Sequence, residues 1–208
     1  MQLFILGGTG KTGSALIGQA LARGHRVTAF GRHAPDSDPL TGRHDIIGSP
    51  MDSDALSAAL VGHDAVLSVL GTRGLGATSV LEDSSRATLA AMRRANVKRL
   101  IIVSSALLDH DIGLLSRIIA RTVLRHHSRD QRAMESLVTA SDVDWTILRP
   151  PRMSDAAAPG HYSLTTGTAP TQTAGTTIRK DEVARAVVDI ADQGQYAREI
   201  VWPSGPRV

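Results

Sequence analysis

The chain has 208 residues, of which 42% are hydrophobic, and carries a formal net charge of +3. These values suit one domain with a sizeable core, and they exclude a disordered protein or a strongly basic protein with a nucleic-acid partner. The absence of cysteine excludes disulfides, thiolate metal sites and a cysteine nucleophile. Because neither a leader pattern nor an apolar run of about 18 residues is found, we expect a cytoplasmic protein without stable membrane association.

Apolar runs and helical faces alternate along the chain and predict a regular series of strands and helices. The expected elements are, in chain order, a strand at 2–6, a helix at 14–23, strands at 26–30 and 44–47, a helix at 53–60, a strand at 65–70, a helix at 82–95, a strand at 99–103, a helix around 134–141, a strand at 145–148, a helix at 181–192 and a short strand at 199–202. This alternation predicts an α/β fold with a Rossmann-type doubly wound parallel sheet, in a single domain over residues 1–208. Residues 154–177 break the alternation and are rich in Ala, Gly, Thr and Pro. We expect them to form either a loop or small hairpin over the substrate pocket, or a mobile surface loop.

A glycine-rich loop over residues 7–13 (GGTGKTG) joins the first strand to the first helix. Its G-x-x-G-x-x-G spacing lets the strand turn sharply, brings a pyrophosphate close to backbone N–H groups and packs the helix against the sheet. The helix N-terminus then offers its positive pole to the phosphates. An ATP-binding P-loop is excluded because Ile5 occupies the place of its first glycine. The expected dinucleotide-binding residues of the loop are Gly7, Thr9, Gly10, Lys11, Thr12 and Gly13.

The end of the second strand bears on the choice between NAD and NADP. NAD-binding proteins usually have Asp or Glu here to bind the ribose 2′-hydroxyl, whereas this chain has Arg32 and His33 and no carboxylate before Asp36. Arg32 can form a bidentate pair with a 2′-phosphate, so we expect NADP(H) as the cofactor, bound by Arg32 and His33. The alternative for Arg32 is a solvated surface arginine. Asp52, after the third strand, either reaches the adenine amine or caps the next helix.

Short motifs occur in order along most of the chain: GGTGKTG at 7–13, GR at 31–32, LGTR at 70–73, VSSA at 103–106 and RPP at 149–151. With them the chain resembles the atypical short-chain dehydrogenases/reductases, in particular the biliverdin-IXβ reductase/flavin reductase group. The residues that this resemblance places along the cofactor are Leu70, Gly71, Thr72, Arg73, Ser104 and Pro150. The residues that it places beside the nicotinamide and the substrate are Ser105, Arg152 and Met153.

The chemistry of these side chains leaves alternatives open. The hydroxyls of Ser104 and Ser105 can stabilise charge that develops on an acceptor during hydride addition, or they can cap a turn. Arg152 can pair with an acidic group of the substrate, stack on a flat ring, or lie on the surface.

The chain departs from the Tyr-x-x-x-Lys pair with which most short-chain dehydrogenases move a proton. Its only tyrosines, Tyr162 and Tyr196, lack a lysine four residues further on, and His127 and Gln131 align with the two positions. His127 is either a proton donor, because its reference pKa lies near neutrality, or an exposed helix residue. We predict no metal at His126 and His127, since adjacent helical residues point apart. An acceptor that needs little protein acid therefore fits best.

Residues 114–125 (LLSRIIARTVLR) combine an apolar stripe with arginines at helical spacing. This basic amphipathic pattern indicates a helix packed on the domain, a self-association surface or a membrane-surface helix. We expect a monomer or a homodimer.

Taken together, the patterns predict an NADPH-dependent reductase that passes hydride to a small planar conjugated acceptor: a flavin, a quinone or a tetrapyrrole. Ser105 and His127 are its candidate catalytic residues. The alternative is a non-catalytic NADP(H) sensor that docks on partners through the stripe around Ile118 and Ile119. A sugar-nucleotide epimerase or dehydratase is disfavoured because little chain follows the sixth strand.

Overall fold

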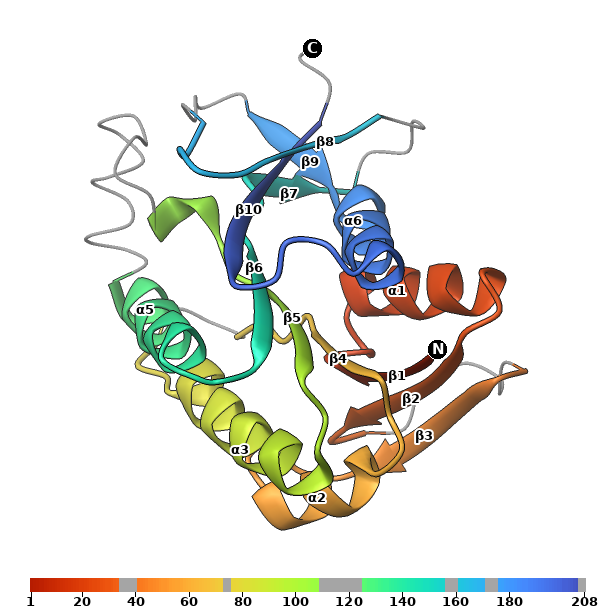
Figure 1. Ribbon diagram of the computed structural model, residues 1–208. Helices are drawn as coiled ribbons and strands as arrows, with labels where there is room; N and C mark the ends of the chain where they lie inside the picture. Colours follow the sequence, from red (N-terminus) through yellow and green to blue (C-terminus); the bar gives the residue numbers. More distant parts are fainter. Residues whose placement is uncertain (34–40, 73–75, 109–124, 156–160, 171–175, 206–208) are drawn as a thin grey trace.

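The computed structural model describes residues 1–33, 41–72, 76–108, 125–155, 161–170 and 176–205. The strands of its main sheet are β1 (Gln2–Leu6), β2 (Arg26–Gly31), β3 (Arg43–Ile47), β4 (Ala65–Ser68), β5 (Arg99–Val103), β6 (Asp144–Leu148), β8 (Ser163–Thr165) and β10 (Glu199–Ser204). They form an eight-stranded sheet in the order β3-β2-β1-β4-β5-β6-β10-β8 (Figure 1). Only β8 is antiparallel to its neighbour among the described pairings. The strand order reverses between β1 and β4, which is where doubly wound sheets bind ligands.

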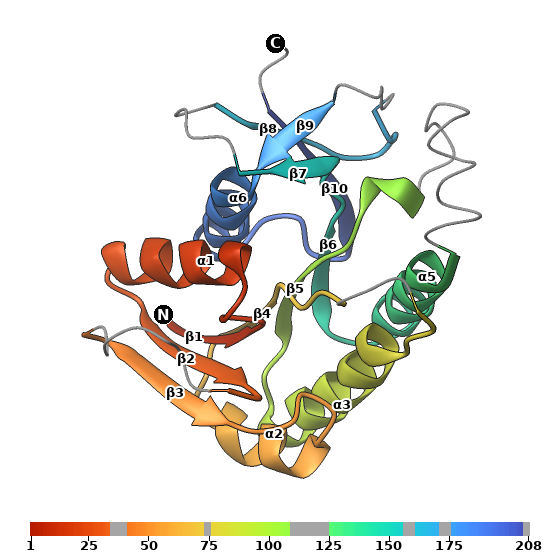
Figure 2. The same ribbon diagram turned by 180° about the vertical axis from the view of Figure 1, so that it is seen from behind.

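Helices cover both faces of the sheet (Figures 1 and 2). On one face α1 (Lys11–Ala22) packs against α6 (Lys180–Gln193). The helices of the other face are α2 (Ser53–Leu60), α3 (Val80–Ala95) and α5 (Arg125–Thr139). This arrangement confirms the predicted Rossmann-type α/β fold. Among the described residues, no helix is both long enough and apolar enough to cross a membrane.

The central strand β1 shows why the sequence needs both helical layers. Leu3 and Ile5 lie in the core beneath α1 and α6, whereas Phe4 and Leu6 lie in the core beneath α2, α3 and α5. Each of these side chains is at most 1% exposed. Successive side chains of a strand point to opposite faces, so a central parallel strand requires a continuous apolar run.

The helix ends follow local chemistry. The C-cap of α3 is Asn96, which adopts the left-handed conformation with φ 56°, and the C-cap of α6 is Gly194 with φ 63°. At the start of α6, the carboxylate of Glu182 accepts a hydrogen bond of 3.0 Å from the backbone N–H of Arg179. α1 begins at Lys11 rather than at residue 14, because Gly10 already serves as its N-cap. The glycine loop is therefore shorter than the sequence analysis expected.

Residues 154–177 differ from the small hairpin that the sequence allowed. β8 adds to the edge of the main sheet by pairing with β10. β7 (Arg152–Ser154) pairs in parallel with β9 (Thr177–Arg179) as a separate two-stranded sheet. β8 thus finds its partner outside the segment, and β7 and β9 pair with each other at its two ends, which a local pattern of turn residues does not specify. Residues 109–124, including the predicted stripe around Ile118 and Ile119, lie outside the described residues.

Candidate functional site

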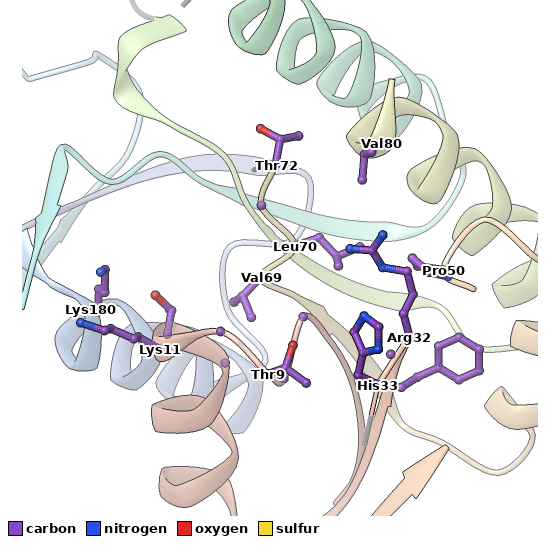
Figure 3. A pocket seen from close by; sticks show the side chains of 18 of the residues that line it. Thr9, Lys11, Arg32, His33, Pro50, Val69, Leu70, Thr72, Val80 and Lys180 are labelled. Carbon is purple, nitrogen blue, oxygen red and sulfur yellow. The ribbon is translucent and has the colours of Figure 1, made fainter. Parts of the chain in front are cut away.

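A cavity of about 520 Å³ lies at the carboxyl ends of β1, β2 and β4, where the strand order reverses. The described residues that line it are Gly7, Gly8, Thr9, Gly10, Lys11, Thr12, Gly13, Phe30, Gly31, Arg32, His33, Pro50, Val69, Leu70, Gly71, Thr72, Thr78, Val80, Met153 and Lys180. Figure 3 shows the side chains arranged around the glycine loop, with Arg32 and His33 on one side and Lys11 and Lys180 on the other. Every described loop residue of the predicted dinucleotide motif therefore faces one cavity.

The three glycines of the motif are under different steric constraints. Gly7 has a φ of +87°, and a Cβ there would lie 2.8 Å from the backbone of Val69. A Cβ on Gly13 would lie 2.1 Å from the carbonyl oxygen of Gly7. Gly10 has room for a side chain, since the nearest atom to its Cβ would be 3.6 Å away. Gly7 and Gly13 thus allow close packing of strand, loop and helix, whereas Gly10 keeps the mouth of the cavity bare.

The start of α1 suits an anion. Gly10 is its N-cap, no side chain caps the helix, and its first turn contains no acidic residue. Unpaired N–H groups and the positive end of the helix dipole attract phosphate at such a position. The cavity therefore offers backbone donors where the sequence analysis expected a diphosphate.

The end of β2 brings two basic side chains to the cavity. Arg32 and His33 both line it and are exposed, and the described lining residues include no Asp or Glu. Asp52 is not among them. Its Oδ1 accepts hydrogen bonds of 3.0 Å from the N–H groups of Asp54 and Ala55, so it caps α2. The structure thus shows the capping alternative for Asp52.

The end of β4 supplies a hydroxyl that connects the cavity to α5. Thr72 lines the cavity, and its Oγ1 lies 2.6 Å from Nδ1 of His127. Burial lowers the pKa of His127, and the nearby carboxylate of Asp130 opposes this effect. His127 is half-buried, so the alternative of an exposed helix residue is wrong. Arg73, which follows Thr72 in the LGTR motif, lies outside the described residues.

The ends of β5 and β6 lie next to each other beyond the cavity lining. The N–H of Ser104 donates to the carbonyl of Leu148 at 2.7 Å, and the N–H of Ala106 donates to that of Pro150 at 2.9 Å. Ser104 is buried, and its Oγ has no hydrogen-bond partner among the described residues. Ser105 is half-buried beside it.

Of the predicted substrate residues, Met153 lines the cavity, whereas Ser105 and the exposed Arg152 do not. Ser104 and Pro150, predicted to touch the cofactor, are also outside the described lining. The cavity therefore gathers the predicted residues that follow β1, β2 and β4 together with Met153, whereas the other predicted residues after β5 and β6 lie outside its described lining.

A partly buried ion pair holds the RPP segment in place. The guanidinium of Arg149 donates to Glu135 of α5 through Nε at 3.1 Å and Nη2 at 2.6 Å. The two side chains are 16% and 9% exposed. Arg149 also lies over the ring of Trp202, 6.0 Å from its centroid. This bidentate contact joins α5, which carries His127, to the end of β6.

The sequence analysis missed several residues of the cavity wall, notably Pro50, Thr78, Val80 and Lys180. Val80 is the first residue of α3, Thr78 lies two residues before it, and Lys180 is the first residue of α6. Lys180 is 169 positions from Lys11 in the chain, and no motif links the two residues. Only the packing of α6 against α1 brings them together.

Comparisons with solved structures agree with this fold. A short-chain dehydrogenase/reductase of Veillonella parvula in complex with NADP is 20% identical, has a TM-score of 0.83, and covers 99% of this chain and 94% of that one. An anaerobillin reductase of Escherichia coli O157:H7 is 22% identical with a TM-score of 0.79, over 100% of this chain and 98% of that one. A candidate NADH-flavin reductase of Streptococcus pneumoniae is 21% identical with a TM-score of 0.78, over 99% and 100% of the two chains.

Sequence comparison gives a family and one group of partial relatives. Over 106 residues the chain is 30% identical to an uncharacterized protein of Mycobacterium tuberculosis. This match covers 50% of the chain but only 12% of that relative's length. Residues 7–194 match the family described as NAD(P)H-binding, a range that contains the whole cavity lining. The chain belongs to this NAD(P)H-binding family, and the solved structures above share its fold.

Proposed function

We propose that the protein is an NADPH-dependent reductase that transfers hydride to a small planar conjugated acceptor. The observation that carries the preference for NADP is the pair Arg32 and His33, which line a cavity without a described acidic residue. A guanidinium binds a phosphate bidentately, whereas NAD-binding proteins usually place a carboxylate at this strand end. Arg32 is exposed and therefore accessible to a 2′-phosphate.

The buried hydroxyl of Ser104 supports a cofactor that extends from the cavity toward β5. A buried polar atom without a partner is costly, and a ribose hydroxyl would satisfy it. Ser104 has such an orphaned Oγ among the described residues. Ser105, the next residue, would then orient the acceptor, with Met153 and Arg152 bordering it from β7.

The bound nicotinamide supplies a hydride, so the chain mainly has to hold two flat rings face to face. The reduced acceptor also gains one proton. His127 contacts Thr72 rather than the cavity, so its proposed role is to orient that hydroxyl and not to protonate the acceptor directly. Because burial lowers its pKa, His127 is mostly neutral at pH 7, which favours an acceptor that takes its proton from water.

The names of the structural neighbours favour a flavin or a tetrapyrrole as acceptor. Both are flat and conjugated, and both accept hydride without the Tyr-x-x-x-Lys pair that this chain lacks. The basic end of β2 and the lack of a Tyr-x-x-x-Lys pair therefore both fit the NADPH-dependent reduction of a planar acceptor.

The test is steady-state oxidation of NADPH and of NADH, followed by absorbance, with FMN, FAD, biliverdin and a quinone panel. We expect turnover with at least one planar acceptor and a higher kcat/KM for NADPH than for NADH. Tight NADPH binding without turnover on the whole panel would favour the sensor instead.

A further inference from the structure

Two of the three lysines in the chain converge on one carboxylate. The Nζ atom of Lys11 lies 2.8 Å from Oδ2 of Asp155, and the Nζ atom of Lys180 lies 2.8 Å from Oδ1 of the same residue. Lys11 starts α1, Lys180 starts α6, and Asp155 follows β7. Three distant segments of the chain thus meet at this cluster.

The two lysines face the proposed cofactor, whereas the carboxylate does not. Lys11 and Lys180 line the cavity, and Asp155 is absent from its described lining. Figure 3 shows both lysines beside the glycine loop, on the side away from Arg32. The cavity therefore has two separate cationic ends, with the uncapped start of α1 between them.

The lysine–carboxylate contacts are of a kind that exchanges readily. The side chains of Lys11, Asp155 and Lys180 are 72%, 51% and 29% exposed. Ion pairs that water screens to this degree add little stability. One carboxylate also neutralises only one of the two ammonium groups, whereas a diphosphate carries two negative charges. The hydrogen bond from Lys11, followed by that from Lys180, holds the pKa of the Asp155 carboxyl below its usual range. It therefore stays ionised at neutral pH.

We propose that Lys11 and Lys180 form an anion subsite for the diphosphate of the dinucleotide, and that Asp155 is its exchangeable counter-ion in the ligand-free protein. The diphosphate replaces the carboxylate, and the ammonium groups then donate to phosphate oxygens. This inference rests on dinucleotide binding in the cavity, which is part of the proposed function. It depends neither on the acceptor nor on the preference for NADP.

The first experiment measures the dissociation constants of NAD⁺ and NADP⁺ by calorimetry at low salt for the wild type and for Lys180→Gln. Both dinucleotides contain the diphosphate, so we expect the substitution to raise both dissociation constants by the same factor. About three- to tenfold is the size of a partly exposed charge-assisted hydrogen bond. Lys98→Gln, which removes the remaining, exposed lysine before β5, is the matched control and leaves both constants unchanged.

The second experiment tests the carboxylate. Asp155→Asn should lower the dissociation constants of both dinucleotides, because the lysines no longer have to separate from a competing carboxylate. This gain should largely disappear when Asp155→Asn is combined with both Lys11→Gln and Lys180→Gln, because the carboxylate pairs with both lysines. Asp54→Asn, which removes an exposed carboxylate paired with Arg94 on α2 and α3, is the control for a general change in charge.

The outcomes separate the subsite from the proposed function. Unchanged affinity in Lys180→Gln, or a loss for NADP⁺ alone, overturns the diphosphate subsite while leaving the reductase intact. A full gain in affinity from Asp155→Asn in the absence of both lysines would reveal a long-range electrostatic effect and would overturn the role of Asp155 as counter-ion. A folded wild type that binds neither dinucleotide overturns both the subsite and the proposed function.

Discussion

The two cationic ends of the cavity are built in different ways. Arg32 and His33 follow one strand directly, so a single short segment places both side chains at the cavity. Lys11, Asp155 and Lys180 come from three elements and meet only because α6 packs on α1 and β7 lies beside them. The first end can be recognised from a strand-end motif, whereas the second depends on tertiary packing. The two ends should therefore respond differently to substitution, ligand and conditions.

The largest effect should come from the loop that lies between the two ends. In Gly13→Ala the new Cβ would lie 2.1 Å from the carbonyl oxygen of Gly7 and 2.7 Å from the Cα of Gly8. Because both contacts are with backbone, we expect a loss of roughly 3 kcal/mol in the free energy of unfolding. Urea unfolding checks the stability, and calorimetry should show weakened binding of NAD⁺ and NADP⁺ alike.

Gly18→Ala is the matched control on the same helix. No atom lies within 4 Å of the position of its Cβ. Alanine favours a helix interior by about 1 kcal/mol over glycine, so this variant should be as stable as the wild type or more so. Equal stability of the two alanine variants would contradict the close packing described for the loop.

The next effect concerns the Arg32 end alone. Arg32→Ala should weaken the binding of NADP⁺ about 10- to 100-fold, the range for a hydrogen bond to a charged group. The binding of NAD⁺ should stay nearly unchanged. Arg26→Ala, an exposed arginine at the opposite end of β2, should alter neither constant. An equal loss of affinity for both dinucleotides in Arg32→Ala would remove the reason for naming NADP. It would also mean that both cationic ends of the cavity bind a group that NAD⁺ and NADP⁺ share.

A smaller effect is expected behind the centre of the cavity, at His127. Burial lowers its pKa in the folded protein. The unfolded chain therefore binds the proton more readily as the pH falls below the ordinary histidine value of about 6.5. The free energy of unfolding should then decrease from pH 7 toward pH 5, and less steeply in His127→Gln than in the wild type.

Chemical denaturation at several pH values measures this difference between wild type and variant. Taking the difference removes the contribution of the other histidines, which both proteins share. Parallel stability curves over the whole range would show that His127 titrates alike in the folded and unfolded chains.

The smallest effect should be that of Asp155→Asn on stability without ligand. Its two ion pairs are exposed, and such pairs contribute little to folding. We expect the urea midpoint to stay unchanged within error, even though dinucleotide binding tightens. A clear drop in the midpoint would mean that the carboxylate is a structural tie between β7 and the helices rather than an exchangeable counter-ion.

Much of the architecture could be predicted from the sequence because its signals are local. The apolar run of β1 and the glycine spacing of residues 7–13 depend on strand and turn geometry that neighbouring residues determine. Arg32 and His33 could be assigned to the cavity for the same reason, since the carboxyl ends of parallel strands share one edge of a sheet. For Asp52 the sequence allowed two roles, and the capping role is also the more local one.

Contacts between distant segments could not be predicted in this way. The burial of His127 against Thr72, the pairing of β8 with β10, and the meeting of Lys180 with Asp155 and Lys11 each join parts of the chain that carry no shared pattern. A single polar residue at the start of a helix has no periodicity to reveal its partner. The sequence by itself thus determined the alternation of elements and the phosphate-binding turn. Only the tertiary structure decided which side chains meet across the cavity, because that depends on how the helices pack on the sheet.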